Sequence, residues 1–108
     1  MNFNINTVLA DMLSAIQGTL SDKWKKVEPV AMQFMQSKKE RLDLLTDLYL
    51  NGDISLQKFE SRLEDDKTIL KAELEAVKVI SKAVAQKAAN AAFDVLANAI
   101  KTAIKTLI

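Results

Sequence analysis

Asn51-Gly52-Asp53-Ile54-Ser55 lies at the midpoint of the chain, between two long helical patterns, and sets how they are arranged. Gly52 readily adopts the left-handed backbone conformation that ends many helices. Asp53 or Ser55 can then cap the next helix with a side-chain oxygen. The stretch therefore predicts that one helix ends, the chain reverses, and another helix begins.

Before this turn, apolar residues recur at three- and four-residue spacings in two segments. The first pattern predicts a helix over residues 4–19, which Asn4 or Asn6 can cap. The second pattern, which runs from Trp24 to Tyr49, predicts a helix over residues 22–50. Both helices should bury one apolar face.

After the turn, the chain contains neither glycine nor proline, so residues 55–107 are predicted to form one third helix. If Ser55 caps this helix, Ile54 and Phe59 have the spacing of a hydrophobic staple. A continuous helix would extend roughly 80 Å, and a bend at the polar run 65–68 is the alternative. The expected fold is all-α: a long antiparallel helical hairpin or three-helix bundle, in a single domain of residues 1–108.

The composition excludes several classes of protein. Hydrophobic residues make up 49% of the chain, with two glycines and one proline, which is unlike a disordered or β-rich protein. Cysteine and histidine are absent, which removes thiolate metal sites and the commonest general base. The acidic residues of the third helix are typical of a solvated face. We therefore expect no enzymatic activity, no cofactor and no metal site.

The net charge of +1 conceals an uneven distribution along the chain. Residues 40–75 carry ten acidic against five basic side chains, whereas residues 76–108 carry five lysines against one aspartate. The chain has just two arginines, which makes nucleic-acid binding an unfavoured interpretation. A signal peptide begins with positively charged residues, and the first residues of this chain carry no positive charge. We therefore expect a cytoplasmic protein.

Residues 76–108 are apolar over well more than half of the helix circumference, because one narrow polar stripe recurs every three or four residues. A helix at the surface of a bundle needs an apolar stripe only somewhat wider than 100°. The first two helices, or a second copy of the protein, should cover the excess. The predicted interaction face follows the widest apolar side: Val84, Ala88, Ala91, Ala92, Val95 and Ala99.

This excess predicts a non-catalytic helical protein that forms a homo-oligomer or binds a helical protein partner. The alternative is a protein associated with a membrane surface, because the polar stripe is rich in lysine. Alanine dominates where such helices favour larger apolar residues, so the protein partner is the preferred hypothesis.

The turn also resembles an EF-hand calcium loop, in which Asp47 would hold the first ligand position and Gly52 the sixth. Lys58 stands at the twelfth position, where that family has a bidentate glutamate, and Tyr49 stands at the third. The resemblance therefore implies a helix-turn-helix that does not bind calcium.

A second resemblance is to the short helical-hairpin domain known as SHOCT, over residues 42–70. A leucine-rich helix ends at Asn51-Gly52, and Ile54-Ser55 then leads to Phe59 in a second amphipathic helix. The chain lacks the glutamate pair of that family and places the hairpin in mid-chain. The resemblance implies oligomerisation or interaction rather than catalysis.

Overall fold

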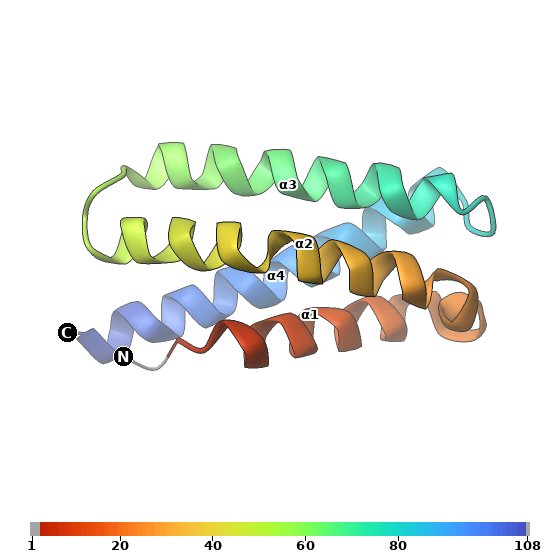
Figure 1. Ribbon diagram of the computed structural model, residues 1–108, viewed down its shortest axis with the longest axis horizontal. Helices are drawn as coiled ribbons and strands as arrows, with labels where there is room; N and C mark the ends of the chain where they lie inside the picture. The colour runs from red at the N-terminus through yellow and green to blue at the C-terminus, as the bar shows by residue number, and fades with distance from the viewer. Residues whose placement is uncertain (1–2, 108) are drawn as a thin grey trace.

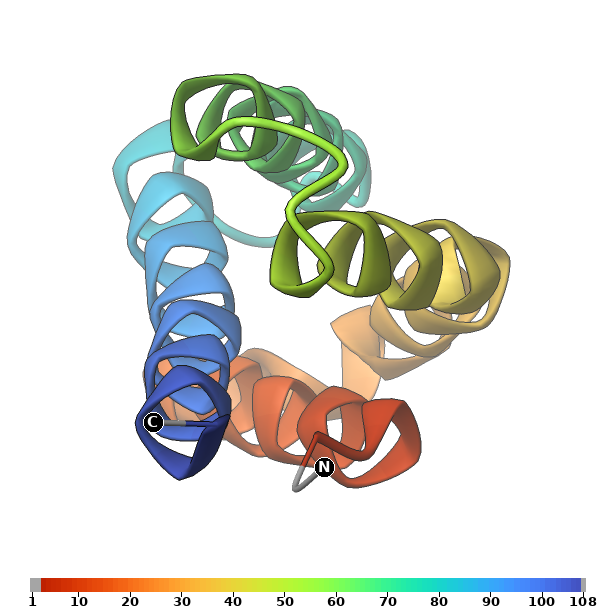
Figure 2. The same ribbon diagram turned by 90° about the vertical axis from the view of Figure 1, so that its left-hand side faces the viewer.

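Residues 3–107, which the computed structural model describes, form four α-helices arranged as a ring in cross-section (Figures 1 and 2). The helices are α1 (Ile5–Leu20), α2 (Trp24–Leu50), α3 (Leu56–Ala76) and α4 (Lys82–Leu107), with a 3-10 helix η1 (Ser21–Lys23) between α1 and α2. Successive helices run in opposite directions. The last helix, α4, packs against both α1 and α3 and closes the ring. The predicted all-α helical bundle is confirmed.

The turn between α2 and α3 is where the sequence predicts it, and its hydrogen bonds form a Schellman motif. The amide of Asp53 donates to the carbonyl of Leu48 at 2.8 Å, and the amide of Gly52 donates to that of Tyr49 at 3.0 Å. Gly52 has φ +80°, the left-handed conformation that an ordinary residue adopts only at a cost. Gly52 therefore ends α2.

Ser55 caps α3, because its Oγ accepts a hydrogen bond from the amide of Lys58 at 3.1 Å. Phe59, one turn further on, is buried, and its ring stacks on that of Tyr49 with centroids 4.7 Å apart. Ile54 is half-buried and packs against the core. This stacked pair joins the end of α2 to the start of α3.

The prediction of one third helix over 55–107 is wrong in one respect, because the chain reverses a second time at residues 77–81. Lys78 has φ +62°, and the Oγ of Ser81 accepts from the amide of Val84 at 3.1 Å and caps α4. The alternative bend at 65–68 does not occur, since α3 runs through these residues. A continuous helix would extend roughly 80 Å, whereas the longest dimension of the molecule is 43 Å.

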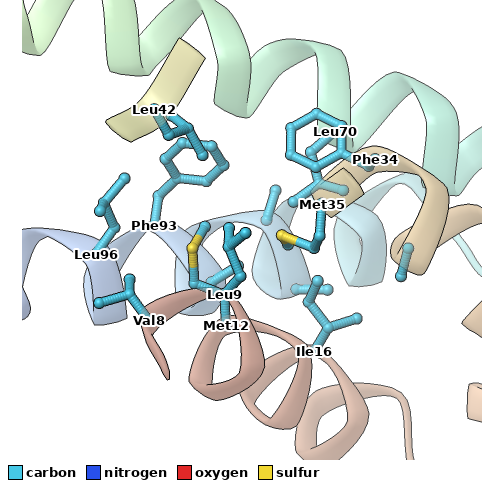
Figure 3. Close-up of a cluster of buried hydrophobic side chains, with 14 of the residues drawn as sticks. Val8, Leu9, Met12, Ile16, Phe34, Met35, Leu42, Leu70, Phe93 and Leu96 are labelled. Carbon is cyan, nitrogen blue, oxygen red and sulfur yellow. The ribbon is translucent and has the colours of Figure 1, made fainter. Parts of the chain in front are cut away.

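The core contains apolar side chains from all four helices, and α1 and α4 have the most extensive contact. Figure 3 shows Met12 and Ile16 of α1 pointing toward α2 and α4. Phe34 of α2 meets Phe93 of α4 edge to face, with ring centroids 6.4 Å apart. The face of α4 that enters this core consists largely of alanine, and small side chains let helix axes approach closely. Its buried alanines are Ala85, Ala88, Ala89, Ala92 and Ala103.

One charged side chain is buried among these apolar residues. Asp66 of α3 is 1% exposed, and the Nε of Arg41 on α2 donates to both of its carboxylate oxygens, at 3.0 and 3.1 Å. The Nζ of Lys38 lies 3.8 Å from the same carboxylate. This ion pair joins α2 to α3 at mid-length.

Candidate interaction surface

The structure divides the predicted interaction face on α4. Ala88 and Ala92 are fully buried inside the chain's own core, so they cannot contact a partner in this fold. Val84, Ala91, Val95 and Ala99 are half-buried beside them. The apolar excess of this helix is therefore largely covered by the other helices of the same chain.

An open apolar groove lies instead between α3 and α4, at the end of the bundle that holds the α2–α3 turn. The two helices meet at the 77–81 connection and diverge toward the other end (Figures 1 and 2). The wider part of the resulting groove has a volume of about 430 Å³. Its wall on the α3 side consists of Leu56, Phe59, Glu60 and Leu63. The α4 side contributes Ala97, Ile100, Lys101 and Ile104, and Tyr49 of α2 completes the lining.

The residues that line this groove differ in how far they are exposed to solvent. Phe59 and Ile100 are buried beneath it, while Leu63, Ala97 and Ile104 are half-buried. Leu56 is 52% exposed, although leucine gains about 1.5–3 kcal/mol from full burial. Ala97, which lacks a larger side chain, leaves the centre of the groove unfilled. The chain therefore presents a concave apolar surface that it does not cover itself.

A narrower part of about 170 Å³ extends the groove toward the 77–81 connection. Glu60, Leu63 and Ala97 line both parts, so the two parts are continuous. We call the whole surface the α3–α4 groove. The narrower part adds Glu64 and Lys67 from α3 and Phe93 and Asp94 from α4.

Charged side chains stand on both rims of the α3–α4 groove. At the wide part Glu60 on α3 stands opposite Lys101 on α4, and both are exposed. At the narrow part Glu64 pairs with Lys67 at 3.0 Å, with Asp94 across from them. Within residues 3–107, none of Glu60, Asp94 and Lys101 forms an ion pair. The groove thus has unpaired charges of opposite sign on its two rims.

A second, shallower groove of about 280 Å³ lies between α1 and α2. Met32, which is 42% exposed, stands over it beside Leu13 and the buried Met35. Lys39 is the one charged residue in its lining. This groove is smaller and lacks the opposite charges of the α3–α4 groove.

The charged residues that line the two grooves are Glu60, Glu64, Lys67, Asp94 and Lys101 in the α3–α4 groove and Lys39 in the second groove. Across residues 3–107, no group of three or more acidic side chains is placed to hold a metal ion. The buried Asp66 is taken up by Arg41 and Lys38, away from both grooves. Thr46, which is buried as well, donates its hydroxyl to the carbonyl of Leu42 at 2.8 Å. In the described part of the chain, no helix combines the length and the apolar character needed to cross a bilayer.

Two sequence resemblances concern the same turn. Only residues 51–55 separate α2 from α3, so most positions of a twelve-residue calcium loop at 47–58 lie within helices. The absence of calcium binding, and the likeness to the SHOCT hairpin, stay predictions.

Sequence reasoning missed most residues of the α3–α4 groove. Leu56, Phe59 and Leu63 have amphipathic spacing, which predicts burial and does not distinguish a core from a groove. Lys101 belongs to the polar stripe of α4, and Glu60 to the acidic segment. The one available signal was the opposite net charge of two segments, which is −5 over residues 40–75 and +4 over residues 76–108.

Comparison of the chain with models of known protein families, with curated proteins and with solved structures finds no match. The function must therefore be argued from the groove and its charges.

Proposed function

We propose that this chain is a non-catalytic helical interaction protein, which binds a second copy or another helical protein through the α3–α4 groove. The observation that carries this proposal is an open groove of about 430 Å³ with an apolar floor and charged rims. Laying an apolar helix face into such a groove is a recurrent mode of protein recognition. Phe59 and Ile100 form the floor, and Leu56 is the exposed anchor at its mouth.

The chemistry of the groove supports binding rather than catalysis. Among its charged side chains Glu64 and Lys67 pair with each other on α3, Glu60, Asp94 and Lys101 stand apart, and Tyr49 stacks on Phe59. The chain contains no histidine or cysteine that could act as a base or nucleophile there. Apolar area flanked by charge gives affinity and orientation without a reaction.

The membrane-surface alternative requires the apolar side of α4 to be free for lipid. In the folded chain Ala88, Ala92 and Leu96 of that side are fully buried against other helices. Insertion would therefore need α4 to leave the bundle and expose the core. The protein partner is the better-supported function.

Two exposed leucines provide a matched test of this proposal. A photo-crosslinking residue replaces either Leu56, at the mouth of the groove, or Leu44, which is 59% exposed on α2 and lines none of the grooves described above. We expect irradiation of cells expressing the Leu56 variant to yield a covalent adduct, either with a second copy or with another protein. The Leu44 variant should yield none. Equal yields at the two positions, or none at either, would contradict a binding role for the groove.

A further inference from the structure

We propose that the molecule that occupies the α3–α4 groove is a second copy of this chain, related to the first by a two-fold axis that runs along the groove. This inference rests on the proposed function of the groove as a binding surface and specifies the partner. It is drawn from the charges on the two rims.

The rims have opposite charges at the same level of the groove. Glu60 of α3 and Lys101 of α4 both line its wide part, and neither forms an ion pair within residues 3–107. At the narrow part Asp94 stands on α4, while on α3 Lys67 already pairs with Glu64 at 3.0 Å. The unpaired charges that matter here are therefore Glu60 and Lys101. Unpaired charges at the rim of an apolar surface are the usual means of fixing the orientation of a partner.

A two-fold axis along the groove exchanges its rims and keeps each level in register. The α3 helix of one copy then lies over the α4 helix of the other. Glu60 therefore faces Lys101 of the second copy, and the Glu64–Lys67 pair together faces Asp94 of the second copy. Because such an interface is self-complementary, each contact occurs twice. No other protein needs to supply the complementary charges, since the chain carries them itself.

The apolar residues fit the same arrangement. Leu56 is 52% exposed, and Leu63 and Ile104 are half-buried along the groove. Facing grooves would enclose these side chains in a shared core with α3 and α4 of both copies around it. Burial of this apolar surface supplies the affinity, whereas the paired charges select the orientation.

Charge reversal at the two rims tests the arrangement. In Glu60→Lys, both rims carry lysine, so each copy repels the other at two places. In Lys101→Glu, both rims carry glutamate, with the same result. We expect either variant alone to dimerise about tenfold or more weakly than the parent in sedimentation equilibrium. Both side chains are exposed, so both variants should keep the circular dichroism spectrum of the parent.

Mixing the two variants gives the decisive measurement. In a mixed dimer, the lysine introduced at position 60 of one variant faces the glutamate introduced at position 101 of the other. The second contact of the same dimer pairs the unchanged Glu60 with the unchanged Lys101. Dimerisation should therefore return to within about threefold of the parent's. If Glu60 and Lys101 attracted each other only within one chain, mixing the two variants would not restore dimerisation.

A control pair, Asp65→Lys and Lys87→Glu, makes the same changes of charge at exposed positions outside the groove. These controls should dimerise like the parent, because neither position faces the second copy in this arrangement.

Two results would overturn the second-copy proposal: a parent that stays monomeric up to about millimolar concentration, or a mixture no more dimeric than its components. Either result leaves the groove open to a different protein, which crosslinking at Leu56 detects independently. The two experiments therefore distinguish a wrong partner, when the second copy does not bind, from a wrong function, when nothing binds in the groove.

Discussion

Gly52 and Gly18 are the chain's two glycines, and the structure predicts opposite outcomes for replacing them. Gly52 has φ +80°, and an added Cβ would meet no atom within 4 Å, so its replacement strains the backbone without a clash. Gly18 lies inside α1, also with open space around the position of a Cβ. We expect Gly52→Val to lower the free energy of unfolding by more than about 1 kcal/mol. Gly18→Ala should raise it by about 0.5 kcal/mol.

Urea unfolding of both variants checks this pair of predictions. If Gly52→Val unfolds at the same urea concentration as the parent, Gly52 does not have the left-handed conformation that ends α2.

The pairing of Arg41 with Asp66 is the second prediction at the scale of single residues. Asp66 is 1% exposed and Arg41 is 43% exposed, so loss of the arginine leaves a buried carboxylate, whereas loss of the aspartate leaves a guanidinium that water can reach. Arg41→Ala should therefore destabilise the fold more than Asp66→Ala does. A double-mutant cycle should give a coupling free energy of about 1–2 kcal/mol.

The matched control is the Lys67–Glu64 pair, whose nitrogen–oxygen distance of 3.0 Å is equally short but whose glutamate is 65% exposed. Its coupling should stay below about 1 kcal/mol, because solvent screens it. Equal coupling in the two cycles would mean that burial adds nothing to the Arg41–Asp66 pair.

At the scale of the helices, the reversal at 77–81 makes a prediction that separates two helices from one. Lys78 has φ +62°, a conformation that costs a lysine roughly 1 kcal/mol and costs glycine little. Lys78→Gly should therefore raise the melting temperature. In a continuous helix the same change would lower it, since glycine costs about 1 kcal/mol in a helix interior. Thermal unfolding followed by circular dichroism gives the sign.

Neighbouring alanines on α4 provide a second test at this scale. Ala92 is fully buried, whereas Ala91 is half-buried. Ala92→Glu places a carboxylate without a partner in the core and should cost at least about 3 kcal/mol of stability. Ala91→Glu can turn its carboxylate toward solvent and should cost far less. If the two variants have the same melting temperature, Ala92 does not face the core while Ala91 faces away from it.

For the molecule as a whole, the distribution of charge predicts how strongly the protein binds to a membrane surface. Lys82, Lys87, Lys101 and Lys105 are exposed along α4, while its apolar side lies in the core. We expect no co-flotation with neutral vesicles and at most weak binding to anionic vesicles, abolished by salt. Strong binding that persists at high salt would show that α4 leaves the bundle and inserts, and the membrane-surface function would replace the proposed one.

Local sequence is enough to predict the helical class, the turn at residues 51–55 and a cap at Asp53 or Ser55, of which the structure has Ser55. These features are local, because a left-handed glycine and a capping serine act through hydrogen bonds within a few residues. The apolar spacing that predicts helices is likewise a property of each segment alone.

The position where the last segment reverses, and the face of that segment that remains accessible, depend on packing between helices. The three- and four-residue spacing of Leu70, Leu74 and Val77 resumes in phase at Ala85 and Ala88, and the polar Ser81 between them is the one local mark of the reversal. The break lets α4 fold back and bury its alanines against α1, which a straight helix of roughly 80 Å could not do. The α3–α4 groove then arises from the divergence of two helices joined at 77–81. Such a feature depends on how helices cross, and no single stretch of sequence specifies that crossing.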